Sequence, residues 1–319
     1  MKFNILHLNS LGEFPVYLQK KLKSFGNYIS NTEAGISENK ALNLAKIADI
    51  LIIAPSALKP VKASFINKLE RTKHIALVTV GYDWIDISEC SKRGITVSTP
   101  IGANSEAVAE HIFGLFVNLA KRISEFHQDI KEKGAYDFRK YTGIELYGKT
   151  LGIIGLGNVG HKVCRISKGF DMNVLAYDRS EKTTKDYKIV DLDTLLENSD
   201  FIAVCIPLTN ETKDLIDKKD ISKMKDDVII ANTAREEVVN KDAVLSAINS
   251  NKVAGYGIET AIMTPIERND PYLKYPNIIL NPHNAFNTRE TAERVNNMVV
   301  DNVISFIKGE PKNLLDTKQ

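Results

Sequence analysis

The sequence predicts an α/β protein with two successive series of strands and helices, each forming a doubly wound parallel sheet. Three observations lead to this fold class. Short apolar runs alternate with helical patterns over the first hundred residues, a second series begins near residue 150, and one long apolar helix separates them. Short runs rich in Ile and Val are typical of strands that a parallel sheet buries on both faces. Their alternation with helices indicates βαβ units.

The first series shows its pattern most clearly between residues 48 and 98. Apolar runs predict strands over 48–54, 74–80 and 95–98. Between them, apolar residues at helical spacing predict helices over 61–69 and 85–92.

The segment 104–131 predicts one long helix. Its apolar residues recur at steps of three and four, and further apolar residues widen the stripe well beyond one face. A helix that is apolar nearly all round is normally buried. We therefore expect it to lie in the core or at a subunit interface, and the two positions are compatible.

The second series starts at Leu151 and ends in a helix predicted over 288–308. Asn287, with Glu290 three residues later, fits a capping box at the start of this helix. The predicted strands of this series are 151–155, 173–178, 201–207, 228–233, 253–259 and 277–280.

Composition excludes several classes of protein. The 319 residues are enough for two domains, and a net charge of +2 argues against the clustered basic charge of a nucleic-acid-binding protein. Three cysteines without a C-x-x-C pair fit a reducing compartment and provide neither a disulfide scaffold nor a cysteine-based metal site. No apolar run approaches the ~18 residues that span a bilayer, and no signal peptide is recognisable. We expect a cytoplasmic protein that binds neither membrane nor metal.

A glycine-rich turn follows the first strand of the second series. Gly155, Gly157 and Gly160 form G-x-G-x-x-G directly between an apolar strand and a helical pattern. Such glycines allow a tight turn, close approach of a pyrophosphate and close helix–strand packing. Asp178 ends the next strand, 18 residues after Gly160, where a carboxylate binds the adenosine ribose and repels a 2′-phosphate. The motif predicts a dinucleotide site that favours NAD over NADP.

The order of the motifs resembles the D-isomer-specific 2-hydroxyacid dehydrogenases over nearly the whole chain. The glycine turn lies about halfway along, and Asn232-Thr233-Ala234-Arg235 and Pro282-His283 follow it. The segment 80–86 resembles the family's substrate-side glycine turn, and 104–111 resembles the start of its long dimer-interface helix.

The resemblance implies a Rossmann NAD-binding domain inserted into a flavodoxin-like substrate domain. The substrate domain would comprise 1–100 and 287–319, and the NAD-binding domain 101–286. It also implies an active site in the cleft between them and a homodimer formed through the region 104–131.

Two side chains carry the chemistry that the resemblance implies. The planar guanidinium of Arg235 can bind a substrate carboxylate through two parallel hydrogen bonds, which a lysine cannot do. Arg235 lies just past a predicted strand, at the edge where open α/β sheets bind ligands. His283 has the residue type that accepts or returns a proton near neutral pH. Together they predict interconversion of a small (R)-2-hydroxy acid and its 2-oxo acid.

The chain departs from the family at the third catalytic position. A glutamate is expected 29 residues after the arginine, where it would raise the pKa of the histidine, but this position is Thr264. Threonine can fix the imidazole tautomer but cannot stabilise imidazolium by charge. Thr264 is therefore the predicted partner of His283, and an NAD(H)-binding regulatory protein with little turnover remains the alternative function.

The resemblance also assigns the remaining binding residues. Backbone N–H groups near Ser56, Ala57, Val80 and Gly81 would complete the substrate pocket beside Arg235. The residues expected to bind NAD are Gly155, Gly157, Asn158, Val159, Gly160, Asp178, Ile206, Thr233, Arg235, Glu259 and His283. The identity of the 2-hydroxy acid is left open.

Overall fold

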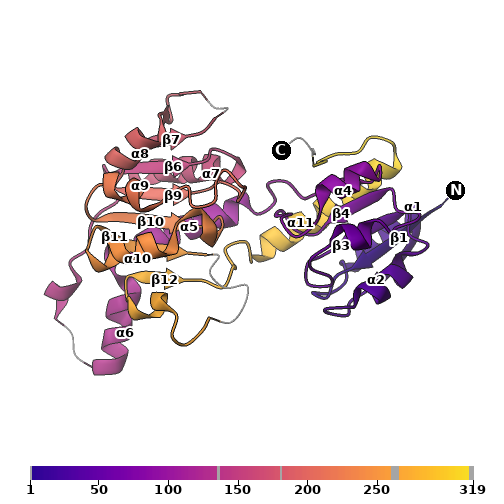
Figure 1. The fold of residues 1–319 in the computed structure, drawn as a ribbon, viewed down its shortest axis with the longest axis horizontal. Coiled ribbons are helices and arrows are strands. Elements are labelled where there is room, and N and C mark those ends of the chain that lie inside the picture. Colours follow the sequence, from indigo (N-terminus) through magenta and orange to yellow (C-terminus); the bar gives the residue numbers. More distant parts are fainter. Residues whose placement is uncertain (1, 135–136, 180–181, 260–265, 316–319) are drawn as a thin grey trace. The chain divides into compact units, whose positions relative to one another are not determined.

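The computed structural model describes residues 2–134, 137–179, 182–259 and 266–315. The chain forms two compact units, one from Met1–Asn104 with Arg289–Gln319 and the other from Ser105–Thr288 (Figure 1). Each unit has its own parallel sheet, which confirms the predicted fold class.

The first unit is built on a five-stranded sheet with the order β2-β1-β3-β4-β5, in which every neighbouring pair is parallel. This is the flavodoxin-like order, and the predicted architecture of this unit is confirmed. The strands are β1 (Phe3–Leu8), β2 (Gly26–Asn31), β3 (Ile50–Ile53), β4 (His74–Leu77) and β5 (Thr96–Ser98).

Helices cover both faces of this sheet. On one face, α1 (Val16–Phe25) and the C-terminal α11 (Arg289–Ile307) pack on buried strand residues that include Ile5 and Ile50. Figure 1 shows α11, in yellow, lying among the indigo and violet elements of this unit. The other face is covered by α2 (Glu38–Ala45), α3 (Ala63–Ile66) and α4 (Ile87–Lys92).

The second unit is built on a seven-stranded parallel sheet with the order β12-β11-β10-β9-β6-β7-β8. Its first strand β6 lies inside the sheet, so the chain reverses direction between β6 and β9, as in a dinucleotide-binding fold. The strands are β6 (Thr150–Ile154), β7 (Asn173–Tyr177), β8 (Lys188–Ile189), β9 (Phe201–Val204), β10 (Val228–Asn232), β11 (Val253–Ile258) and β12 (Ile278–Leu280).

Two hydrophobic layers hold the second sheet. One contains α5 (Ser105–Lys121) and α7 (Asn158–Ser167), and the other contains α8 (Leu192–Asn198), α9 (Lys218–Lys223) and α10 (Lys241–Asn249). The short 3₁₀ helices are η1 (Phe138–Tyr141), η2 (Lys168–Phe170), η3 (Glu236–Val238) and η4 (Pro271–Lys274).

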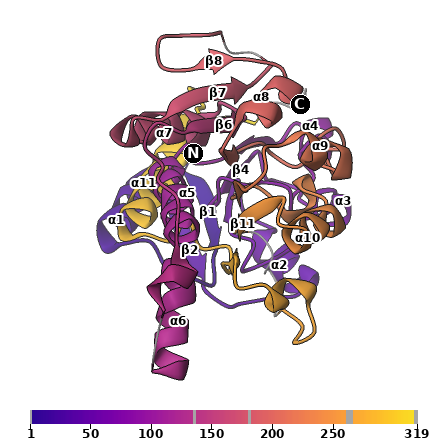
Figure 2. The same cartoon turned by 90° about the vertical axis from the view of Figure 1, so that its left-hand side faces the viewer.

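The prediction of one continuous helix over 104–131 is wrong. The segment forms two helices, α5 and α6 (Ile123–Lys133), separated by Arg122 in a left-handed conformation with φ of 54°. The break is stabilised locally, because the Asn118 side chain accepts a hydrogen bond from the Ser124 N–H at 2.9 Å. Ten residues of α5 are buried, whereas α6 has none and extends away from its unit (Figure 2).

Other predicted elements lie close to the observed ones, with differences at short or polar segments. The helix predicted over 61–69 is only the single turn α3. Strands β1 and β2 complete the first sheet beside the three strands predicted there. Over the described part of the chain, no helix combines the length and apolar character that crossing a membrane requires.

Candidate active site

The glycine turn follows β6 at the point where the strand order reverses. Gly155 has φ of +95°, and a Cβ there would lie 2.5 Å from Ile206 Cγ2. A Cβ on Gly160 would lie 2.1 Å from the carbonyl oxygen of Gly155. Both positions therefore require glycine. Gly155 needs it for its positive φ and its close contact with Ile206, and Gly160 needs it so that α7 can pack against the turn.

Gly157 differs from these two glycines because the space beside it is open. Among the described residues, and apart from the two chain neighbours of Gly157, no atom lies within 4 Å of a Cβ built at this residue, which immediately precedes α7. The first N–H groups of an α-helix have no partner within it, and they carry the positive end of the helix dipole. Gly157, Asn158 and Val159 thus fit a pyrophosphate, and this turn has the shape that NAD requires.

Asp178 follows β7 and lies beside this turn. Its Oδ2 accepts a hydrogen bond from the Leu156 N–H at 2.9 Å, so the carboxylate is fixed against the glycine turn. This is the position predicted for binding the adenosine ribose. The neighbouring Arg179 points into an exposed ion pair with Glu211 at 2.9 Å.

The loop after β10 holds Arg235 through a buried asparagine. Asn232 is fully buried, and its side chain donates to the Arg235 carbonyl at 2.8 Å and accepts from the Ala234 N–H at 3.1 Å. The Arg235 guanidinium donates back to the Ala234 carbonyl at 2.8 Å. Thr233 lies half-buried between them. Asn232 therefore fixes the backbone that orients Arg235.

His283 lies just past β12, in a left-handed conformation with φ of 51°. Its N–H donates to the carbonyls of Glu259 at 2.8 Å and Asn281 at 2.9 Å, and its ring lies 6.1 Å from that of Phe286. Because β10, β11 and β12 are parallel neighbours, Arg235, Glu259 and His283 follow the same edge of one sheet. The structure thus gathers these predicted site residues along the edge that carries the glycine turn.

Glu259 is a buried carboxylate with a polar neighbour at each oxygen. Oε1 accepts the Ala285 N–H at 2.7 Å, and Oε2 lies 2.9 Å from His111 Nε2. The side chain therefore connects the His283 loop to α5. Sequence reasoning gave His111 no role in the site, because the motif 104–111 indicated only the start of an interface helix; the tertiary fold brings this histidine to Glu259.

The predicted third catalytic residue, Thr264, lies outside the described residues.

The turn predicted to face the substrate lies in the first unit, after β4. Thr79 Oγ1 and Trp84 Nε1 both donate to the Gly81 carbonyl, at 2.8 and 3.0 Å. Within the described residues, the N–H groups of Val80 and Gly81 donate no hydrogen bond. Because the Gly81 carbonyl is occupied and the N–H groups of Val80 and Gly81 are available, this turn fits an anion such as a carboxylate.

The neighbouring loop after β3 provides one further donor. Over the described ranges, the Ser56 N–H donates no hydrogen bond, whereas the Ala57 N–H donates to the Ala54 carbonyl at 3.0 Å. Of this predicted pair, Ser56 is thus the available donor and Ala57 shapes the turn.

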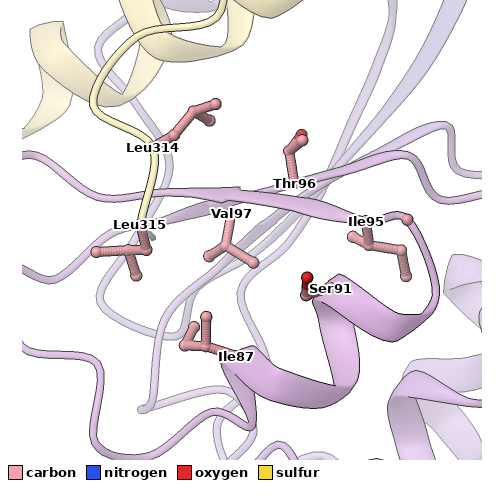
Figure 3. A pocket seen from close by; sticks show the side chains of 8 residues that line it. Ile87, Ser91, Ile95, Thr96, Val97, Leu314 and Leu315 are labelled. Atoms are coloured by element: carbon pink, nitrogen blue, oxygen red, sulfur yellow. The ribbon is translucent and has the colours of Figure 1, made fainter. Parts of the chain in front are cut away.

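Two cavities lie away from the predicted catalytic residues. One, of about 200 Å³, is lined mainly by apolar side chains of α4 and β5 and by the C-terminal residues Leu314 and Leu315 (Figure 3). The other, of about 450 Å³, lies beside the junction of α5 and α6 and the amino ends of β10 and β11. Neither is lined by Arg235 or His283.

Comparison with known proteins agrees with these features. Residues 113–285 match the family described as D-isomer specific 2-hydroxyacid dehydrogenase, NAD binding domain. The chain is 35% identical to a glyoxylate reductase of Korarchaeum cryptofilum over 87% of its length and 86% of the relative's. It is 34% identical to a hydroxypyruvate reductase of Thermotoga maritima over 85% of its length and 89% of the relative's.

A solved structure shows the same fold. The D-lactate dehydrogenase of Aquifex aeolicus, complexed with NAD and lactic acid, is 30% identical and has a TM-score of 0.81. The alignment covers 96% of each chain. The glycine turn with Asp178, the Arg235 and His283 loops, and these relatives lead to one conclusion: the chain belongs to the D-isomer-specific 2-hydroxyacid dehydrogenases and is an NAD-dependent oxidoreductase of 2-hydroxy acids.

Proposed function

We propose that this enzyme reduces a small 2-oxo acid of two or three carbons to the (R)-2-hydroxy acid, and catalyses the reverse oxidation. The observation that carries the proposal is the common sheet edge of the glycine turn, Arg235 and His283. The two relatives described above are by name a glyoxylate reductase and a hydroxypyruvate reductase, which supports a short substrate.

Each catalytic side chain has one task in this proposal. Arg235 binds the substrate carboxylate through its planar fork and so orients the C2 carbonyl. His283 gives a proton to the carbonyl oxygen during reduction and takes it back from the hydroxyl during oxidation. Bound NADH supplies the hydride that forms the new C2–H bond. Thr264, in place of a carboxylate, would fix the tautomer of His283 without adding charge.

The binding residues divide by the part of the ligand they face. Gly155, Gly157, Asn158, Val159 and Gly160 hold the pyrophosphate, and Asp178 holds the ribose. Ile206, Thr233 and Glu259 flank the nicotinamide half, with Glu259 acting from its buried position below the His283 loop. The backbone N–H groups of Ser56, Val80 and Gly81 donate hydrogen bonds to the substrate, and Ala57 supports the turn that contains Ser56.

Arg235→Lys tests the carboxylate site, because it keeps the charge and removes the fork. We expect kcat/KM for glyoxylate and hydroxypyruvate to fall by an amount equivalent to ~2–4 kcal/mol, with NADH affinity nearly unchanged. The assay is NADH oxidation followed by absorbance. Arg179→Lys is the matched control, since among the described residues Arg179 forms an exposed ion pair with Glu211. Full activity of Arg235→Lys on every accepted acid would exclude Arg235 as the carboxylate ligand.

We also infer that the enzyme is a homodimer of a reducing compartment, the cytoplasm. The helix α6 buries none of its residues in its own chain, and Ile123 and Ile130 on it are exposed. A second copy of the chain would cover this face. The cysteines Cys90, Cys164 and Cys205 are all free thiols, which is typical of such a compartment.

A further inference from the structure

Asn9 lies at the end of β1 with its side chain fixed in one orientation. Its Oδ1 accepts the Leu11 N–H at 3.1 Å and lies 3.5 Å from the Ser56 hydroxyl. Because Oδ1 must be the acceptor toward a backbone N–H, the amide cannot be flipped, and Nδ2 points away from this turn.

The Nδ2 of Asn9 is an available donor. The residue is only 8% exposed, yet over the described ranges Nδ2 makes no hydrogen bond and is not among the fully buried atoms. The residue is therefore nearly buried, and its amide nitrogen keeps some exposure at the carboxyl edge of the five-stranded sheet, where Asn9 follows β1. A nearly buried amide with a free donor is suited to binding a polar group of a ligand.

The neighbouring loops place this donor beside the proposed carboxylate site. Strand β3 separates β1 from β4, and the three strands end together, since Ala54 N–H donates to the Leu8 carbonyl at 3.0 Å and Val78 N–H to the Ile53 carbonyl at 3.1 Å. Asn9 follows β1, Ser56 follows β3, and the free N–H groups of Val80 and Gly81 follow β4. All belong to the first unit.

The distance between the Asn9 loop and the Val80–Gly81 turn favours a substrate with a polar group on C3. Loops two strands apart are separated by about 10 Å. A three-carbon hydroxy-oxo acid measures about 5 Å from a carboxylate oxygen to the C3 oxygen. Hydrogen bonds of about 2.9 Å at each end extend this span to about 11 Å, close to the separation of the loops. Glyoxylate has no C3, and pyruvate has only a methyl group there.

We propose that Asn9 Nδ2 donates a hydrogen bond to the C3 hydroxyl of the substrate while the N–H groups of Val80 and Gly81 hold its carboxylate, so that the enzyme prefers a 3-hydroxy-2-oxo acid, hydroxypyruvate, to pyruvate. This rests on the proposed function, which it narrows to one substrate class. Asn9 is then a specificity residue, and it takes no part in proton or hydride transfer.

The test compares three acids in the wild type and in Asn9→Leu. Hydroxypyruvate, pyruvate and glyoxylate are reduced with NADH, and kcat and KM are determined for each. In the wild type we expect a preference for hydroxypyruvate over pyruvate of about tenfold or more, the value of one hydrogen bond in a largely desolvated site. In Asn9→Leu this preference should disappear, while kcat/KM for glyoxylate should change by no more than about twofold.

Asn31→Leu is the matched control. Asn31 ends the adjacent β2 in the same kind of turn, with its Oδ1 accepting the Glu33 N–H at 3.1 Å, but it lies one strand farther from β4. It should leave the ratio between hydroxypyruvate and pyruvate unchanged. If Asn9→Leu does not fold, Asn9→Ser keeps a hydroxyl for the turn and is too short to reach the substrate, so the same loss of preference is expected.

The outcomes separate this proposal from the proposed function. A wild type that reduces none of the three acids overturns both. A wild type that is active, with Asn9 variants that keep the preference for hydroxypyruvate, overturns only the role of Asn9. An equal loss on glyoxylate and hydroxypyruvate also overturns it, because a merely structural residue would behave in this way.

Discussion

At the scale of single residues, we expect the carboxylate of Asp178 to decide between NADH and NADPH. Asp178→Asn keeps an oxygen for the Leu156 N–H but removes the charge that repels a 2′-phosphate. We expect the ratio of NADPH to NADH affinity to rise about tenfold or more, the scale of one like-charge repulsion near a protein surface. Fluorescence titration with both reduced cofactors measures it.

The matched control for cofactor choice is Asp186→Asn. Asp186 belongs to the same unit and pairs with Lys168 at 2.7 Å, and its carboxylate is partly exposed. This variant should leave the cofactor ratio unchanged. A wild type that binds NADPH as tightly as NADH would contradict the role given to Asp178.

The second residue-scale prediction concerns the contact between Glu259 and His111. Glu259→Ala leaves the buried Ala285 N–H without its acceptor and His111 without its partner. We expect a loss of about 2–4 kcal/mol in the free energy of unfolding, measured with urea. Glu259→Gln keeps an acceptor for the Ala285 N–H and should lower the free energy of unfolding by less than Glu259→Ala does.

Glu106→Ala is the control for this comparison. Glu106 pairs with Lys162 at 2.8 Å, but both side chains are more than a third exposed, so a loss of no more than about 1 kcal/mol is expected. Equal losses for Glu106→Ala and Glu259→Ala would mean that the buried contact does not stabilise the fold.

The same residues show what the sequence could and could not predict about the site. Arg235 and His283 are recognisable because their immediate neighbours form local motifs. The contact between His111 and Glu259 cannot be predicted from the sequence. It forms only when α5 packs near the end of β11, and these elements are far apart along the chain. Asn9 was likewise not identified, because a polar residue after a short apolar run resembles any turn.

At the scale of elements, α6 is the proposed dimer surface, because it buries no residue in its own chain. We expect the double variant Ile123→Glu, Ile130→Glu to fold normally, because α6 buries no residue in its own chain, and to be monomeric. Burying a new charge in an interface is strongly unfavourable. Sedimentation velocity measures the oligomeric state at several protein concentrations.

Gln128→Glu serves as the control in the same helix. Gln128 lies away from the stripe of Ile123 and Ile130, with its side chain bonded to Glu132 at 2.8 Å. It should leave the assembly unchanged. A monomeric wild type, or a dimeric double variant, would rule out α6 as the dimer surface.

The break before α6 illustrates the limit of periodicity. Apolar residues continue at helical spacing through Arg122, so the pattern predicts a single helix. The left-handed Arg122 is held by polar contacts, among them Arg122 Nε to Glu125 at 2.8 Å and Asn118 to the Ser124 N–H at 2.9 Å. Hydrophobic spacing contains no information about such contacts.

At the scale of the whole molecule, the chain returns to its first unit after completing the second. Arg294 Nε on α11 donates to the Ala103 carbonyl at 2.8 Å, and Asn302 Nδ2 donates to the Thr99 carbonyl at 3.2 Å. These bonds join the C-terminal helix to the strand end where the chain leaves the unit. The first sheet was harder to predict than the second, because β1 carries the polar His7 within its apolar run.

The buried histidines of the first unit predict that it is the acid-sensitive part of the enzyme. Burial lowers the pKa of His7 to about 4, although Glu13 opposes the shift, and it lowers the pKa of His74 to about 4. His7 stacks on Phe14, and His74 stacks on Phe306 while bonded to Thr96 and Ser98. Both must become charged when the unit unfolds at mildly acidic pH.

The direction in which stability changes with pH follows from proton binding. With a pKa of about 6.5 in the unfolded chain and about 4 in the folded one, each histidine binds more protons in the unfolded chain over this range, so stability falls as pH drops from 6.5 towards 4. Each group can contribute up to about 3 kcal/mol. Trp84, the single tryptophan, is buried in the same unit, so its fluorescence during urea unfolding reports on that unit alone. We expect its midpoint to fall between about pH 7.5 and about pH 5. Glutamine does not bind a proton in this pH range, so His74→Gln should show a smaller fall of the midpoint. An equal fall in the wild type and in His74→Gln would show that His74 is not the source of the acid sensitivity.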